Sequence, residues 1–194
     1  MNQPQTPQQL RRNRLMLIAL FAIFLGSLGV AGVLRLTGWR PAGMKNYGEL
    51  LQPPGDLRAV TPELLEGGAY AWNPQARMWR IVLAPPERCG VQCPRLAEQI
   101  YTVWQLAGQD ADRVQVLWLC PSPKCWVPQP LSRSPALRRI NATPALRAGL
   151  PRSDDPHGVP VYLVDPNGFV VMRYAPGFDP AGLRADLAKL LKLM

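Results

Sequence analysis

Residues 78–107, which read MWRIVLAPPERCGVQCPRLAEQIYTVWQLA, decide the fold expected for this chain. The segment Met78 to Ala84 is apolar, contains β-branched residues and has no helix or strand breaker, which predicts a strand. After a proline loop, apolar residues recur at helical spacing over 95–107, which predicts a helix with Pro94 in its first turn. Cys89 and Cys93 therefore fall in the turn between a strand and a helix.

Further elements are expected on the C-terminal side of this unit. The sequence predicts a strand over 114–119, a helix over 134–148 broken or bent near Pro144, a hairpin of strands 159–164 and 169–174, and a helix that begins at Asp179. A strand–helix–strand unit implies parallel strands with a right-handed crossover, and the hairpin adds an antiparallel edge. The predicted class is α/β, a thioredoxin-like domain with a central mixed sheet flanked by helices.

An apolar segment precedes this domain. Leu15 to Leu34 is a run of 20 residues without a charge, and about 20 helical residues span the hydrocarbon core of a membrane. The 194-residue chain has a net charge of +9, of which residues 1–45 hold +6 with no acidic residue. The excess charge thus flanks the apolar segment, which indicates membrane topology, and we exclude nucleic acid as a partner.

We divide the chain into a cytoplasmic tail (1–14), a transmembrane helix (15–36), a connector (37–68) and a thioredoxin-like domain (69–194). A cleaved signal peptide is the main alternative for the apolar segment, but its apolar core usually has only about 7–15 residues. Arg11, Arg12 and Arg14 precede the segment, and the positive-inside rule then favours a cytoplasmic N-terminus. We expect a single-pass protein of the inner membrane with a periplasmic C-terminal domain.

The four cysteines all follow the apolar segment. Cys89 and Cys93 are spaced C-x3-C, and Cys120 and Cys125 are spaced C-x4-C. An even number of cysteines suits an oxidising compartment, whereas neither spacing is the C-x2-C of common zinc sites. Each pair could form a purely structural disulfide. The alternative for Cys120 and Cys125 is an accessory pair near the first, which exchanges disulfides with it or holds a second metal.

Two motifs stand out in this region. The first is Cys89-x-x-x-Cys93-Pro94, and the second is His157, five residues before Tyr162 and followed by the turn Asp165-Pro166-Asn167-Gly168. Both resemble the Sco/SenC family, whose members have a C-x3-C-P turn and are membrane-anchored, thioredoxin-like proteins that deliver copper to cytochrome c oxidase. The resemblance covers about residues 45–194. Val159-Pro160 also resembles the cis-proline turn of ordinary thioredoxins.

The sequence departs from the Sco pattern at two places. Ala84 to Arg88 replaces an aromatic and Gly/Thr-rich segment, and Cys120 to Cys125 replaces a Ser-x-Asp-Pro segment. The resemblance therefore indicates a divergent relative. It implies that Cys89 and Cys93 are the functional thiols and that these two cysteines and His157 ligate copper. Thiolates suit Cu(I), and thiolate with imidazole suits Cu(II). The alternative for His157 is a loop histidine without a ligand role.

These observations favour a metal carrier or thiol reductase, which would not turn over a small metabolite. The first hypothesis is a copper-binding assembly factor for the copper centre of cytochrome c oxidase, whose partners are the inner membrane and an oxidase subunit or another copper or thiol assembly protein. The second is a periplasmic thiol–disulfide oxidoreductase with Cys89 and Cys93 as its redox centre. The third is a non-catalytic assembly scaffold with a thioredoxin-like domain.

Overall fold

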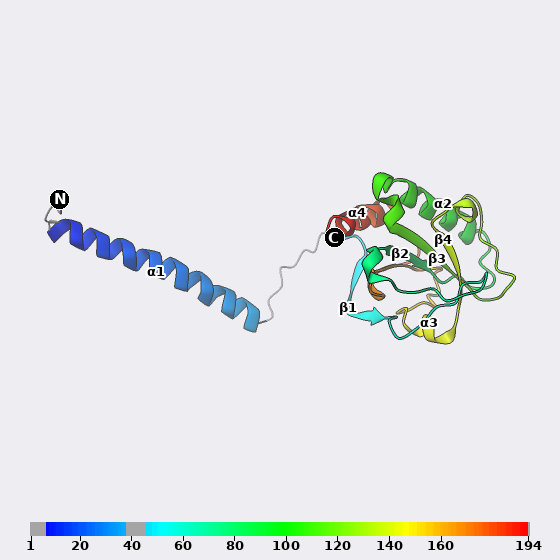
Figure 1. Cartoon of the computed structure of the whole chain (residues 1–194), viewed down its shortest axis with the longest axis horizontal. Coiled ribbons are helices and arrows are strands. Elements are labelled where there is room, and N and C mark those ends of the chain that lie inside the picture. The colour runs from blue at the N-terminus through cyan, green and yellow to red at the C-terminus, as the bar shows by residue number, and fades with distance from the viewer. Residues whose placement is uncertain (1–6, 38–45, 194) are drawn as a thin grey trace. The chain divides into compact units, whose positions relative to one another are not determined.

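The computed structural model describes residues 7–37 and 46–193 and divides the chain into two compact units, 1–45 and 46–194. Helix α1 (Pro7–Leu36) belongs to the first unit and has 30 residues, none of them buried. It is long and apolar enough to cross a membrane, with a mean hydropathy of 2.5 over its most apolar window. The helix contains the whole predicted transmembrane segment and begins before it, at Pro7 (Figure 1).

The second unit is built on one six-stranded sheet with the order β1-β6-β5-β2-β3-β4. Strands β2, β3 and β4 are parallel to one another, and β5, β6 and β1 continue the sheet in antiparallel pairs. The strands are β1 (Glu49–Asp56), β2 (Trp79–Leu83), β3 (Val114–Cys120), β4 (Leu137–Asn141), β5 (Val161–Val164) and β6 (Phe169–Tyr174).

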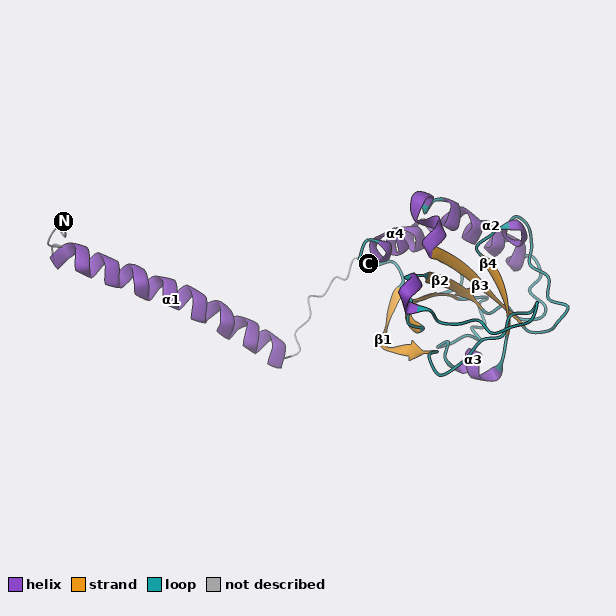
Figure 2. Ribbon diagram, viewed as in Figure 1, coloured by secondary structure: helices purple, strands orange, loops and turns teal. Residues whose placement is uncertain are grey.

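Helices cover both faces of this sheet. Helices α2 (Gln92–Gln105) and α4 (Pro180–Leu191) lie on one face, and the short α3 (Pro144–Ala148) lies on the other (Figure 2). Because successive strand residues point to opposite faces, the strands contribute to two cores. Trp79, Ile81 and Leu83 pack with α2 and α4, whereas Val82 packs with Leu146 of α3. The expected thioredoxin-like sandwich of a mixed sheet between helices is confirmed.

Most of the expected elements are present. Strands β2 and β3, helix α2, the β5–β6 hairpin and helix α4 occupy the segments that the sequence predicts. Asp179 caps α4, since its carboxylate accepts a hydrogen bond from the N–H of Ala181. In the hairpin turn, the Asp165 carboxylate accepts hydrogen bonds from the N–H groups of Asn167, Gly168 and Phe169.

The helix expected over 134–148 is wrong. Residues Leu137–Asn141 form β4, which pairs in parallel with β3, and only Pro144–Ala148 are helical. The helix starts there because the Thr143 hydroxyl accepts a hydrogen bond from the N–H of Leu146 and Pro144 fits a first helical turn. The Val159-Pro160 bond is not cis, since the cis bonds among the described residues are Gln52-Pro53 and Gln129-Pro130.

The compact domain also begins earlier than residue 69. It starts at Asn46, and Glu49–Asp56, which we assigned to the connector, form edge strand β1 beside β6. Leu57 from the same segment is fully buried in the core on the α3 side of the sheet. The part of the connector from residue 46 onward therefore belongs to the folded domain.

Candidate functional site

Cys89 and Cys93 form a disulfide at the start of α2, with 5.5 Å between their Cα atoms. Cys93 lies in the first turn of the helix and is buried, whereas Cys89 lies in the preceding loop and is half-buried. Gly90 adopts a φ of +52° in this tight turn, a conformation that favours glycine. The predicted strand–turn–helix setting of the pair is therefore present.

Cys120 and Cys125 form the second disulfide, with 5.4 Å between their Cα atoms. Cys120 is the last residue of β3 and is only 2% exposed. Cys125 follows a turn in which its N–H donates to the carbonyl of Ser122, and it is half-buried. Each pair thus combines one buried and one half-buried cysteine.

Both disulfides border one cavity of about 530 Å³. Cys89, Cys93 and Cys125 line it, together with the buried Trp118 and the 70% exposed Trp126. The cavity forms because β2 and β3 are parallel neighbours, so the loops that follow their carboxyl ends meet at the same edge of the sheet. The sequence-predicted pairs are therefore brought together at one site.

Charged side chains also border this cavity. Arg88 and Lys124 contribute positive charge and Glu87 contributes one negative charge. Sequence reasoning did not single out these residues or Trp126. The available signal was their position, because each lies directly beside a cysteine or within two residues of one.

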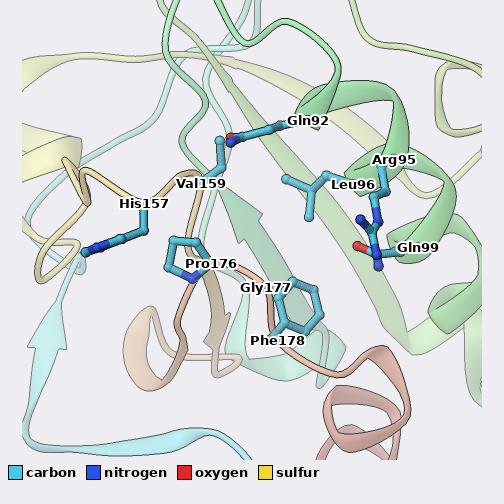
Figure 3. Close-up of a pocket in the computed structure, with 9 residues that line it drawn as sticks. All are labelled: Gln92, Arg95, Leu96, Gln99, His157, Val159, Pro176, Gly177 and Phe178. Atoms are coloured by element: carbon cyan, nitrogen blue, oxygen red, sulfur yellow. The ribbon is translucent and has the colours of Figure 1, made fainter.

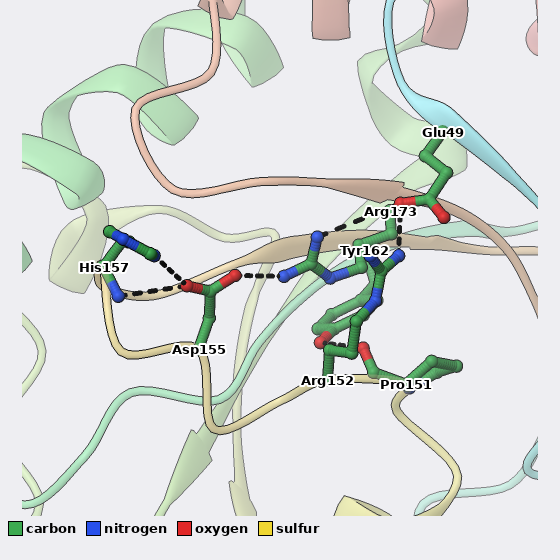
Figure 4. Close-up of polar contacts among 7 residues, drawn as sticks. All are labelled: Glu49, Pro151, Arg152, Asp155, His157, Tyr162 and Arg173. Carbon is green, nitrogen blue, oxygen red and sulfur yellow. Dashed lines mark hydrogen bonds and ion pairs between the residues drawn. The ribbon is translucent and has the colours of Figure 1, made fainter.

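His157 lies in the loop before β5, in a different setting from the cysteines. Its backbone N–H and its ring Nδ1 contact the Asp155 carboxylate at 3.0 and 3.1 Å, and its side chain is 86% exposed (Figure 4). Asp155 also pairs with the buried Arg173 at 2.5 Å. The hydrogen bond from the His157 N–H lowers the pKa of Asp155, and the Arg173 guanidinium acts in the same direction. Desolvation opposes this shift but does not cancel it. The loop is thus tied to β6 through a carboxylate.

His157 lines a second pocket, which has a volume of about 250 Å³. His157, Gln92 and Val159 are among the residues that line it, and none of the four cysteines does so. The imidazole ring is directed away from Gln92, the first residue of α2 (Figure 3). The structure therefore brings Cys89, Cys93 and Cys125 together and leaves His157 outside their cavity.

Copper binding at this site depends on which donor atoms are available and how they are arranged. Over residues 7–37 and 46–193, no group of three or more His, Cys, Asp or Glu side chains is arranged to hold a metal ion. All four cysteines are in disulfides, and copper binding by cysteine requires thiolates. After reduction, Cys89 and Cys93 would provide two soft ligands on one turn, whereas His157 would have to reorient to become a third.

Comparison with known proteins identifies the family. Residues 79–194 match the family described as transmembrane-like, thioredoxin-like, C-terminal domain. The chain belongs to this family. Curated proteins compared by sequence gave no match.

Solved Sco structures share the fold of this family member. Apo Sco1 from Thermus thermophilus has 19% identity and a TM-score of 0.52, and covers 79% of this chain and 100% of its own. Copper-bound yeast Sco1 has 17% identity and a TM-score of 0.50, with 78% and 96% covered. Copper-bound ScoI from Arabidopsis thaliana has 16% identity and a TM-score of 0.50, with 76% and 99% covered. The expected resemblance to Sco is confirmed in the fold, and the low identity fits a divergent relative.

Proposed function

We propose that this chain is a membrane-anchored, copper-binding and thiol-redox assembly factor for the copper centre of cytochrome c oxidase. The observation that carries the proposal is the position of Cys89 and Cys93, at the start of α2 and open to a cavity, in a fold shared with copper-bound Sco proteins. Copper is the cargo of this protein, and the reduced cysteine pair is its carrier site.

The chemistry of the site requires two states. In the disulfide state the pair does not bind copper, and in the dithiol state its two sulfurs suit Cu(I). His157 completes the site when its exposed ring turns from Asp155 towards α2. Among the described residues, the ring has one polar contact, the hydrogen bond to Asp155, and the His157 side chain is 86% exposed. The rotation therefore breaks a single contact at the surface, which costs little.

The position in the cell follows from α1 and from the cysteines. Helix α1 anchors the chain in the inner membrane, and the domain lies in the periplasm, where disulfides persist. The acceptor of the copper is an oxidase subunit or another copper or thiol assembly protein at the same membrane. Nucleic acid is not a partner.

Titration of the reduced full-length chain with Cu(I) in detergent tests this function. We expect one bound copper per chain, loss of binding in the variant Cys89→Ser/Cys93→Ser, and weaker binding in His157→Ala. The matched control Cys120→Ser/Cys125→Ser should retain the copper. Absence of binding, or binding that survives the loss of Cys89 and Cys93, would contradict the proposal.

A second function, thiol–disulfide oxidoreductase, is favoured by a separate observation. His157 lies outside the cavity that holds both disulfides, so a cycle between dithiol and disulfide does not need it. Reduction of insulin disulfides by the full-length chain without copper binding would support this function. A chain that shows neither activity would be a scaffold.

A further inference from the structure

The second disulfide lies on the same side of the sheet as the first. Alternate residues of β3 point to opposite faces, and Val116, Trp118 and Cys120 all belong to the core that packs against α2. Cys93 is part of this core, and Cys89 and Cys125 pack against its edge. All four cysteines therefore belong to one packed cluster or contact it. The two half-buried cysteines, Cys89 and Cys125, both line the cavity.

We propose that Cys120–Cys125 is a redox partner of Cys89–Cys93, and that the two pairs exchange electrons across the cavity through a transient Cys89–Cys125 disulfide. This inference does not depend on copper binding. It assigns an exchange function to a disulfide that would otherwise only stabilise the loop after β3.

The exchange proceeds in two balanced steps once a dithiol donor has reduced Cys89–Cys93. The Cys89 thiolate, formed by loss of its proton, attacks Sγ of Cys125. A Cys89–Cys125 bond forms, the Cys120–Cys125 bond breaks and Cys120 leaves as a thiolate that takes up a proton. The Cys93 thiolate, formed by loss of its proton, then attacks Sγ of Cys89 and releases Cys125, which is protonated. Two electrons and two protons pass from the first pair to the second, and each step is reversible.

The residues around the cavity suit this exchange. Thiol–disulfide exchange requires a thiolate and an accessible sulfur. The basic side chains of Arg88 and Lys124 border the cavity and stabilise thiolates, as does the N-terminal end of α2 beside Cys93. Cys89 and Cys125 are the more exposed residues of their pairs, whereas Cys93 and Cys120 are buried.

The exchange would keep a reserve of reducing equivalents within the domain. A dithiol protein that reduces Cys120–Cys125 at the accessible Cys125 would thereby supply the electrons that open Cys89–Cys93. Electron transfer from the first pair to the second would close the Cys89–Cys93 disulfide again. The second pair thus sets how long Cys89 and Cys93 remain reduced in an oxidising compartment.

Trapping of the mixed disulfide tests the proposal. The variant Cys93→Ala/Cys120→Ala retains only Cys89 and Cys125, and alanine suits the two buried positions because it adds no polar group. We expect mild oxidation of this full-length variant with diamide in detergent to give an intrachain Cys89–Cys125 disulfide, identified by peptide mapping. A folded variant that keeps both thiols free, or that crosslinks only between chains, would overturn the proposal.

The matched control is Cys93→Ala/Cys125→Ala, which retains Cys89 and the buried Cys120. Its intrachain disulfide should form about tenfold more slowly, because access to the sulfur limits the rate. Equal rates in the two variants would overturn the assignment of Cys125 as the exchanging sulfur. Circular dichroism reports whether each variant is folded.

A single substitution serves if the double variant does not fold. In Cys93→Ala the free Cys89 faces an intact Cys120–Cys125 disulfide, and exchange should yield the Cys89–Cys125 bond together with a Cys120 thiol that alkylation labels. Labelling of Cys89 alone would overturn the proposal. None of these measurements involves copper, so they can fail while the copper titration succeeds, and the reverse.

Discussion

Asp186 is a buried carboxylate that ties the start of the domain to α4. It accepts hydrogen bonds from the N–H groups of Tyr47 and Gly48 at 2.7 and 3.0 Å and from the Tyr174 hydroxyl at 3.0 Å, and it pairs with Lys189 at 3.0 Å. Burial opposes ionisation of this group, but the Gly48 N–H and the Lys189 ammonium outweigh it and lower the pKa of Asp186. The charged form is therefore part of the native structure.

Replacement of this carboxylate should destabilise the domain. In Asp186→Asn, one acceptor oxygen becomes a donor that faces other donors, and the loss of buried hydrogen bonds costs about 1–3 kcal/mol of unfolding free energy. Urea denaturation of the full-length chain measures the difference. The exposed Asp112→Asn variant is the control, and we expect no comparable change in it.

The stability of the unsubstituted chain and that of Asp186→Asn should respond differently to acid. Because the pKa of Asp186 in the folded state is below its usual 3.8, the stabilisation is complete above the unfolded-state value and is lost as the pH falls through the folded-state value. The stability advantage of the unsubstituted chain over Asp186→Asn should thus shrink as the pH falls below 3.8. A difference that stays constant from neutral to acidic pH would contradict this assignment.

The residues of the candidate site differ in how far the sequence predicts them. Cys89 and Cys93 are placed correctly because a strand, a tight turn and a helix start are local features. Cys125 lies near them because parallel neighbouring strands end at one edge, which the sequence also indicates. The position of His157 depends on Asp155 and the distant, buried Arg173, and no local pattern reveals that contact.

At the scale of elements, the sequence predicts the central strands and misses both edges of the sheet. Strands β2 and β5 are buried along their whole length, and apart from Arg80 they consist of apolar residues and Tyr162. Strands β1 and β4 each have a single buried residue, and β1 contains Pro53 and Pro54. An edge strand tolerates proline and polar residues because one side has no partner, so its pattern resembles a loop.

Gly182 of α4 packs closely against the chain before β1. For this reason we expect alanine to be less stable than glycine at this position, although alanine has the higher helix propensity. Alanine is favoured over glycine in helices by up to about 1 kcal/mol. A Cβ atom on Gly182 would, however, lie 2.7 Å from Cβ of Tyr47, and overpacking of this kind costs about 1–3 kcal/mol. We expect Gly182→Ala to lower the midpoint of thermal unfolding.

The control for this prediction removes the neighbouring side chain. Tyr47 is 69% exposed, and Tyr47→Gly eliminates the atoms that a new methyl group would meet. In that background Gly182→Ala should raise the midpoint of unfolding, because only the helix propensity remains. If Gly182→Ala has the same sign in both backgrounds, contact with Tyr47 does not determine the choice of glycine.

At the scale of the whole molecule, the charges separate into two groups. Residues 1–45 carry +6 with no acidic residue, and the remaining residues carry 16 basic and 13 acidic side chains. The domain is thus nearly balanced, while the basic excess flanks the one helix that is long enough to cross a membrane. Most of the net positive charge of the protein therefore lies around this helix.

The proposed orientation of α1 in the inner membrane can be tested by changing this charge. Alkaline phosphatase fused after residue 194 folds only outside the cytoplasm. We expect an active fusion, because the positive-inside rule and Arg11, Arg12 and Arg14 favour a cytoplasmic N-terminal side. Replacement of these three arginines by asparagine should lower the phosphatase activity per fusion protein, since inverted chains then accumulate. Replacement of Arg35 and Arg40 by asparagine is the matched control and should leave the activity unchanged or raise it. An inactive phosphatase fusion together with a fluorescent cytoplasmic reporter fusion would place the cysteine pairs in a reducing compartment and contradict the periplasmic assignment.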